Sequence, residues 1–309
     1  MAAPSAPPTP PPPPALPGPF VSTAWLEQHL GEPGLVVLDA TVVQRRTGGY
    51  LSGLDEYLIV GHLPTAVFAD LVESFSAPDG PYPLTRPTAE QFAAVAGEHG
   101  IGPDTAVVVY DGSFGEWAAR LAWLILGFGH DRVAVLDGGL TKWRAEGRPV
   151  DCGYVAPVPA RFEARERPGF WADRPDVEAA LSDGSVLLSA QPRRAFAGDP
   201  EGRPRGGRLP GSIGVPVVRL LDRSTNALLP ADQLRQVLTP ALRDEPVLSY
   251  CASGVAAAFD ALVLRALGRT DVRVYDAGLA EWAADPALPL ETADPATPGP
   301  QPGDAQIAP

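Results

Sequence analysis

The chain has 309 residues, of which 45% are hydrophobic and 20% are charged, which is enough apolar content for two globular domains. Its formal net charge of −13 argues against nonspecific binding to nucleic acid or to anionic membranes. Two cysteines cannot form a disulfide framework in a chain of this size, and the four histidines are scattered. The sequence therefore predicts neither a metal site nor a bound cofactor, and a reducing, cytoplasmic setting is expected.

Both ends of the chain have the composition of tails. Residues 1–19 include the run Pro10–Pro14 and have neither a basic n-region nor an apolar h-region. They are predicted to form a disordered or polyproline-II tail and not a signal peptide. Residues 291–309, rich in Pro, Ala and Thr, are expected to be disordered as well. No apolar run approaches the ~20 residues that a membrane-spanning helix needs.

Between the tails the sequence repeats itself. Four short stretches of the first half recur in the same order in the second half, and the last pair is the clearest. The pairs are 35–39 with 185–189, 61–64 with 207–210, 107–111 with 247–251, and 135–143 with 274–282. This order predicts the duplication of one domain of about 120 residues.

The same α/β pattern is expected in both copies. Short apolar stretches alternate with stretches in which apolar residues recur at helical spacing. The latter are residues 88–100, 117–127 and 231–242. This alternation predicts a parallel sheet with helices on both faces in each domain. We expect a first domain at 20–150 and a second at 172–290. Residues 151–171, rich in proline and arginine, are expected to link them.

Cys251 stands where a buried strand gives way to a helix. Residues 247–250 are mostly apolar and predict a parallel strand, and the apolar spacing from 256 to 267 is helical, with Gly268 placed to end it. Cys251 therefore opens a short loop at a helix N-terminus. Unpaired N–H groups there favour an anion, either a thiolate or a charged substrate. The small residues that follow let the backbone curl around the sulfur.

Two other interpretations of this cysteine fit the sequence less well. A packed structural cysteine is common in proteins, but a strand end opening into a loop of small residues is not a core position. A phosphatase-like Cys-x5-Arg loop needs an arginine six residues later, where this chain has Ala257. The remaining interpretation of Cys251 is a nucleophilic thiolate held mainly by backbone donors. Cys152 has no supporting residues around it and is interpreted as incidental, with redox regulation as a minor alternative.

Taken together, these motifs resemble a known family. The motif Gly-His-Leu-Pro at 61–64, the Asp-Gly-Gly-Leu-x-x-Trp motif at 137–143 and the loop 251–256 resemble a two-domain rhodanese-type sulfurtransferase over about residues 20–288. The resemblance implies that the second domain is catalytic and the first is not. Asp111 stands in the first copy where the second has Cys251, and a carboxylate cannot carry a transferable sulfur.

The resemblance also implies a reaction. The loop is similar to that of members that prefer 3-mercaptopyruvate, because it lacks the Arg and Lys that follow the cysteine in thiosulfate-preferring members. The Cys251 thiolate would attack the donor sulfur, leaving pyruvate and a persulfide. A thiol such as reduced thioredoxin, or cyanide, would then accept the sulfur. Thiosulfate as the donor, or a degenerate member acting as a persulfide carrier or interaction module, are the alternatives.

Further residues follow from the resemblance. Ser253 would relay a proton to the departing carbon, together with His62 and an acidic partner, for which Asp55 is nearest. For His62 a structural hydrogen bond that fixes its loop is the alternative. Of the two substrate arginines of the family, Arg203 matches one; the other position is Ala195, so Arg194 would have to substitute for it.

The expected substrate-binding residues are Arg203, Arg194, Ala252, Gly254, Val255 and Ala256. Two other arginines, Arg205 and Arg208, could supply the positive charge instead.

Overall fold

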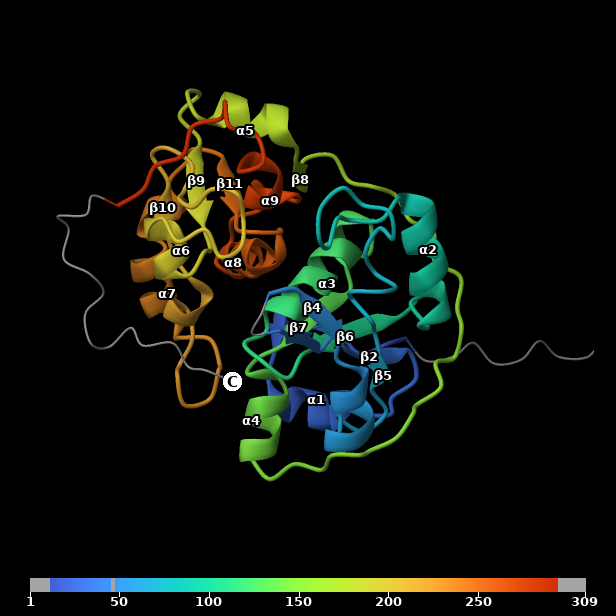
Figure 1. The fold of residues 1–309 in the computed structure, drawn as a ribbon. Coiled ribbons are helices and arrows are strands. Elements are labelled where there is room, and N and C mark those ends of the chain that lie inside the picture. The colour runs from blue at the N-terminus through green and yellow to red at the C-terminus, as the bar shows by residue number, and fades with distance from the viewer. Residues whose placement is uncertain (1–11, 46–47, 294–309) are drawn as a thin grey trace, which may run out of the picture.

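The computed structural model describes residues 12–45 and 48–293. It contains two five-stranded parallel sheets, one in each half of the chain. Figure 1 shows the two domains side by side, with helices α3 and α8 meeting between them and the connecting segment running around the outside of the first domain. The predicted duplication and fold class are confirmed.

The elements of the first domain follow in chain order. They are β1 (Phe20–Val21), α1 (Thr23–His29), β2 (Leu35–Asp39), β3 (Val42–Gln44), β4 (Tyr50–Ser52), the π-helical turn η1 (Glu56–Val60), β5 (Val67–Phe68), α2 (Ala89–Glu98), β6 (Ala106–Tyr110), α3 (Glu116–Gly127), β7 (Val133–Leu136) and α4 (Gly139–Ala145). Strands β3 and β4 form an antiparallel hairpin outside the main sheet.

The second domain repeats this plan. Its elements are β8 (Trp171–Ala172), α5 (Arg174–Ala180), β9 (Val186–Ser189), α6 (Arg193–Ala197), β10 (Ile213–Gly214), the 3-10 turn η2 (Val217–Arg219), α7 (Ala231–Val237), the 3-10 turn η3 (Thr239–Leu242), β11 (Val247–Tyr250), α8 (Val255–Ala266), β12 (Val272–Tyr275) and α9 (Gly278–Trp282).

The strand orders of the two sheets correspond. The first sheet runs β1-β7-β6-β2-β5 and the second, read from its opposite edge, runs β8-β12-β11-β9-β10. Strands β6 and β11 are therefore equivalent central strands, and both are buried along their whole length. Strands covered on both faces in this way need near-continuous apolar runs, which is what their sequences provide. The domain limits 20–150 and 172–290 stay a proposal, and β8 begins one residue before the second of them.

Helices cover both faces of each sheet. In the first domain, α1 and α4 pack with Val37 and Val108 on one face, whereas α2 and α3 pack with Val107 and Val109 on the other. The last helix of each domain is fixed by an equivalent tryptophan. The indole nitrogens of Trp143 and Trp282 donate to proline carbonyl oxygens at 2.7 and 2.9 Å, so both are core anchors.

The chain ends extend the domains further than the sequence predicted. Residues 1–11 and 294–309, where most of the expected disorder falls, lie outside the described residues. Leu16, however, packs against the core of the first domain, and Glu291 forms a backbone bridge with Arg208. The predicted tails are therefore too long on the domain side. Among the described residues no helix is long and apolar enough to cross a membrane.

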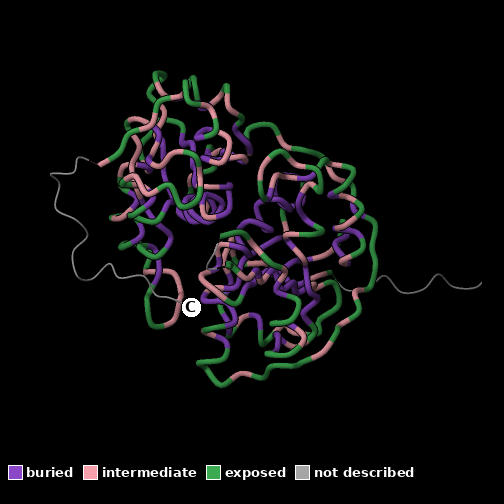
Figure 2. The backbone as a smooth tube through the Cα atoms, in the orientation of Figure 1, coloured by how far each residue is buried: buried purple, intermediate pink, exposed green. Residues whose placement is uncertain are grey.

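The two domains share one hydrophobic core. Helices α3 and α8 pack against each other. The ring of Phe20 in the first domain packs edge-on against that of Phe259 in the second, with the ring centroids 5.9 Å apart. Figure 2 shows buried backbone concentrated in the two sheets and in the helices between them. Burial of this apolar surface stabilises one relative orientation of the domains.

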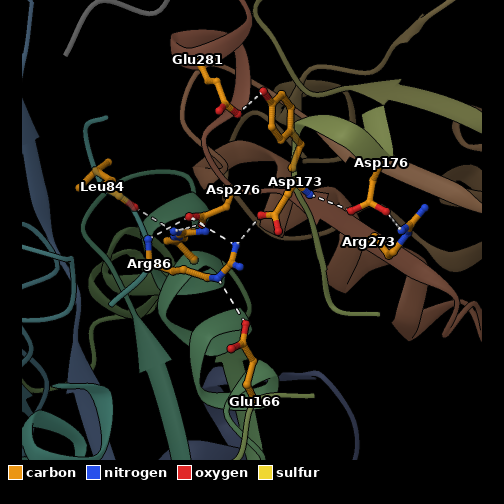
Figure 3. A network of polar contacts seen from close by, with 10 residues as sticks. Leu84, Arg86, Glu166, Asp173, Asp176, Arg273, Asp276 and Glu281 are labelled. Carbon is orange, nitrogen blue, oxygen red and sulfur yellow. Dashed lines mark hydrogen bonds and ion pairs between the residues drawn. The ribbon is translucent and has the colours of Figure 1, made fainter. Parts of the chain in front are cut away.

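Polar contacts between the two domains also help to fix their relative orientation (Figure 3). The buried Arg120 donates to a carboxylate oxygen of Asp276 at 2.5 Å and to the Leu84 carbonyl at 2.8 Å. The backbone N–H of Arg86 donates to the other oxygen of Asp276 at 2.9 Å. In the reverse direction the Leu228 N–H donates to Asp137, the repeat equivalent of Asp276, at 2.7 Å. Each domain thus holds a loop of the other.

Candidate active site

The site is centred on Cys251, directly after the central strand β11 of the second sheet. Its side chain is buried, with the residue only 4% exposed. Gly254, with a φ of 72°, is the N-cap of the 12-residue helix α8. The loop is therefore shorter than predicted, because Val255 and Ala256 already belong to the first turn of the helix. The left-handed backbone of Gly254 favours glycine there.

Backbone donors surround the sulfur. Burial raises the pKa of the Cys251 thiol, and hydrogen bonds from the backbones of Ala257, Ser253 and Ala256 act in the opposite direction. These N–H groups lie in the first turn of α8 and in the loop before it, where they have no partner within the helix. Attack by this sulfur requires that the thiol first lose its proton.

The equivalent loop of the first domain shows what such a ring of donors binds. The Asp111 carboxylate accepts the N–H groups of Ser113 at 2.8 Å and of Trp117 and Ala118 at 3.0 Å. In the duplicated sequence these three residues correspond to Ser253, Ala256 and Ala257. The first domain therefore fills its anion site with its own carboxylate, whereas the second places a sulfur atom there.

The turn after β12 packs against the cysteine loop and is hydrogen-bonded to it. The N–H groups of Leu279 and Ala280 donate to the carbonyl oxygens of Cys251 and Ala252 at 2.9 and 3.0 Å. A methyl group on Gly278 would lie only 2.5 Å from the Cys251 oxygen. Glycine at this position is what allows the two backbones to approach each other.

Ser253 and Tyr50 join the two domains at the site. Ser253 is buried in the loop after Cys251, and its side chain acts on the phenol of Tyr50 in β4 from the other domain. Burial raises the pKa of Tyr50, and the charges of Cys251, Glu116 and Glu201 raise it further. Sequence reasoning missed Tyr50 because the β3–β4 hairpin carries no catalytic motif.

Glu116, at the start of α3, was also missed. Burial raises the pKa of its carboxyl to about 7, with a contribution from the Asp111 carboxylate, and its charge acts on the Cys251 thiol. One signal was available in the sequence: Glu116 directly follows Gly115, the repeat equivalent of Gly254. That position places it at the N-terminus of the helix that packs against α8.

Arg203 lies beside Glu201 in the second domain. Its side chain is 10% exposed and one guanidinium nitrogen lies 3.5 Å from Glu201, whose charge acts on Tyr50. The nitrogens Nε and Nη2 of Arg203 are buried and have no hydrogen-bond partner in the part of the chain that the structure describes. Buried, unpaired guanidinium donors are costly, so they are suited to binding an anion.

The other three arginines of this segment form contacts of their own. Arg194 is 62% exposed and pairs with Asp199 at 2.6 Å, and its role in place of the missing family arginine stays a prediction. Arg205 donates to backbone carbonyls around the end of α9, among them Trp282, Ala283 and Leu288. Arg208 lies over the ring of Phe196 and pairs with Glu291. Their guanidinium groups are occupied by structural contacts.

His62 has a structural placement. It is fully buried and stacks on Tyr57, and its two ring nitrogens lie 2.8 and 3.0 Å from the carbonyl oxygens of Leu63 and Gly153. Asp55 is exposed on the surface before η1. No hydrogen bond joins these two side chains in the described part of the chain, and the relay through them stays a prediction. The structural alternative for His62 agrees with its backbone bridge to Asp151, which Arg208 repeats with Glu291.

Comparisons with known proteins agree with this architecture. A family model described as the rhodanese-like domain matches residues 22–146 and 173–285. The chain is 34% identical over 303 residues to the mitochondrial thiosulfate/3-mercaptopyruvate sulfurtransferase 1 of Arabidopsis thaliana, covering 89% of this chain and 79% of that protein. It is 35% identical over 325 residues to the thiosulfate sulfurtransferase of Corynebacterium glutamicum, covering 95% and 97%.

A solved structure is similar over most of its length. The crystal structure of the 3-mercaptopyruvate sulfotransferase SseA from Escherichia coli matches with a TM-score of 0.75 and 30% identity, covering 84% of this chain and 98% of that one. Two parallel α/β domains with one buried cysteine in a ring of backbone N–H groups define a class of tandem-domain transferases. The chain belongs to the rhodanese family, with two rhodanese-like domains, and it is a sulfurtransferase.

Proposed function

We propose that Cys251 takes a sulfur atom from 3-mercaptopyruvate and carries it as a persulfide to a thiol or to cyanide. The observation that carries this proposal is the correspondence between the two loops. The backbone N–H groups that hold the Asp111 carboxylate in the first domain have direct equivalents around the Cys251 sulfur. A site that binds a carboxylate in one domain is suited to stabilise a thiolate or a persulfide anion in the other.

The reaction needs no external oxidant or reductant. The Cys251 thiolate attacks the donor sulfur and the bond between that sulfur and C3 of the donor breaks. Its electron pair passes to C3, which takes up a proton, so the products are pyruvate and a Cys251 persulfide. Cysteine sulfur is oxidised and the donor carbon is reduced by the same two electrons.

The charge distribution favours a monocarboxylate donor. Ala252, Ser253 and Ala256 give the loop no cation, so the positive charge at the site comes from Arg203 and the N-terminus of α8. We propose that Arg203 binds the donor carboxylate, with Ala252, Gly254, Val255 and Ala256 around the reacting sulfur. Thiosulfate is the second candidate donor, and the name of the Corynebacterium glutamicum relative supports it.

Other parts of the functional hypothesis come from the sequence alone. Thioredoxin as the thiol acceptor and a cytoplasmic location stay predictions. The same is true of the alternative role as a persulfide carrier, which differs from the enzyme in requiring a protein donor. Sulfur uptake from a free small molecule separates the two.

The test compares two cysteine variants. Cys251→Ser is expected to abolish release of pyruvate from 3-mercaptopyruvate and formation of thiocyanate with cyanide, with no loss of fold. Cys152→Ser, the matched control, should keep the wild-type rate, because Cys152 is exposed beside Ile59 in the first-domain region. Turnover retained by Cys251→Ser would contradict the proposal.

A further inference from the structure

We propose that Leu84 and Gln191 are positioning residues, which leave the catalytic loop 251–254 free to adjust when Cys251 gains and gives up a sulfur atom. This inference rests on the proposed function and deepens it. It comes from comparing the catalytic loop with its equivalent in the first domain, residues 111–115, called here the inert loop. Side chains hydrogen-bond to the backbone of the inert loop at places where the catalytic loop has no such bond in the described part of the chain.

A strap from each domain docks beside the loop of the other domain. The two straps are residues 77–87 and residues 222–229. In the first strap the backbone N–H of Arg86 donates to Asp276, and in the second strap the backbone N–H of Leu228 donates to Asp137, the repeat equivalent of Asp276. Figure 3 shows Leu84 and Arg86 of the first strap beside Asp276. The two straps therefore dock in the same way.

Leu84 and Asn226 occupy the same place in their straps. Each lies two residues before the docking N–H group, and each has a left-handed backbone, with φ of 59° and 56°. Asparagine tolerates this backbone, whereas leucine is strained by it. The amide nitrogen of Asn226 donates to the carbonyl oxygen of Ser113 in the inert loop at 3.1 Å. Leucine has no donor, and the Leu84 side chain packs in the shared core, so it cannot hold the equivalent carbonyl of Ser253.

The neighbouring residue of the loop shows a second difference. In the inert loop the N–H of Gly112 donates to the Thr41 hydroxyl at 3.0 Å. In the repeat Gln191 stands in the place of Thr41, and Ala252 in that of Gly112. The Gln191 amide is bonded instead to the Ser189 hydroxyl at 3.0 Å and to a backbone carbonyl at 3.4 Å. Among the described residues no hydrogen bond joins Gln191 to Ala252.

The difference has a chemical consequence. Thr41 and Asn226 hold two successive residues of the inert loop, whereas Gln191 and Leu84 hold neither equivalent residue in the part of the chain that the structure describes. Persulfide formation adds one sulfur atom inside a loop whose cysteine is only 4% exposed. Because protein interiors are closely packed, the backbone around the sulfur has to shift to accept it. The loop that reacts is the one without these two bonds.

The experiment gives the catalytic loop the side chains of the inert one. Leu84→Asn introduces the amide that Asn226 has, and Gln191→Thr introduces the hydroxyl that Thr41 has. Each change is expected to slow formation of the Cys251 persulfide from 3-mercaptopyruvate about fivefold, the factor by which one net hydrogen bond shifts an equilibrium. The rate is measured by mass spectrometry in a single turnover.

Hydrogen–deuterium exchange gives a second readout. Exchange of the peptide 250–257 should be slower in Leu84→Asn than in the wild type, whereas a merely damaged core would make it faster. Leu84→Ala is the matched control, because it removes the same packing without adding a donor, and it should slow neither persulfide formation nor exchange. Asn226→Ala frees the inert loop and should keep the wild-type rate.

The contradicting results are distinct. Wild-type rates of persulfide formation in both Leu84→Asn and Gln191→Thr would overturn the inference. Equal slowing by Leu84→Asn and Leu84→Ala would also overturn the role of Leu84, because lost packing would explain both. Wild-type protein that gains no sulfur from 3-mercaptopyruvate would contradict the proposed function instead. The exchange measurement needs no donor, so it still tests whether the new side chain holds the loop.

Discussion

Arg120 of the first domain and Asp276 of the second form a buried ion pair that lies against Gly254, the residue that caps helix α8. A methyl group on Gly254 would lie 2.7 Å from the Asp276 carbonyl oxygen and 3.1 Å from the Arg120 guanidinium. The contact that fixes the domain orientation therefore also supports the loop that carries Cys251. Domain packing and the geometry of the sulfur site depend on the same residues.

Removing Arg120 is expected to destabilise the whole chain. Arg120→Met would remove the closer of the two arginines that pair with the buried Asp276 carboxylate and leave Arg86 at 3.9 Å, so the free energy of unfolding should fall by up to about 3–5 kcal/mol. Urea unfolding measures this cost. Arg161→Met is the matched control, because the Arg161 side chain is 86% exposed and its loss should change stability by less than about 0.5 kcal/mol. Equal stabilities of the two variants would contradict the structural role given to the ion pair.

Gly278 is expected to control the position of the cysteine loop. Gly278→Ala would force the turn away from the Cys251 carbonyl, so sulfur uptake should slow, with a loss of about 1–3 kcal/mol in stability from backbone strain. Gly184→Ala separates the two effects, because Gly184 also has a positive φ but has open space around it. That variant should lose some stability and keep the wild-type rate. A Gly278→Ala protein of unchanged activity would show that the loop does not rest on this turn.

The reactivity of Cys251 should increase with pH beyond the usual range of a thiol. Because burial raises its pKa above the ordinary value, little thiolate is present at pH 7, and the fraction grows as pH rises through and beyond 9. The rate of alkylation by iodoacetamide, followed on the Cys251 peptide between pH 6 and 10.5, should therefore keep rising at the alkaline end. A plateau reached below pH 8 would indicate a thiol with a lowered pKa and would contradict the environment described here.

Arg203 is expected to set the affinity for the donor. Arg203→Met removes guanidinium donors that have no other partner, so KM for 3-mercaptopyruvate should rise by about tenfold to a hundredfold, the usual range for a hydrogen bond to a charged group. Arg194→Met should leave KM within about twofold, since Arg194 is exposed and paired with Asp199. A larger effect at Arg194 than at Arg203 would reverse the assignment made from the geometry.

Much of the fold was accessible from the sequence because it was duplicated. The echo of 107–111 in 247–251 identified the two central strands and placed Cys251 after one of them, and the structure gives strand β11 the predicted limits. Local chemistry was enough here, since apolar runs, glycines and a cysteine at a strand end each have a direct structural consequence.

The residues that make up the site were harder to predict from the sequence than the fold was. Tyr50 and Glu116 interact electrostatically with Cys251 across the contact between the two domains, and no local pattern encodes that contact. Arg194 and His62 are predicted site residues whose polar groups have other partners in the structure. Their residue types suit substrate binding and proton transfer, but Asp199 and the backbone carbonyls of Leu63 and Gly153 already occupy their polar groups.

The most direct test of the central claim is mass spectrometry of the reduced protein after separate incubation with 3-mercaptopyruvate and with thiosulfate. The account predicts one added sulfur, ~32 Da, on the Cys251 peptide, gained faster from 3-mercaptopyruvate, and none on the Cys152 peptide. Faster gain from thiosulfate would keep Cys251 as the sulfur carrier and overturn the donor. No added sulfur on Cys251 from either compound would contradict the sulfurtransferase mechanism proposed for this site.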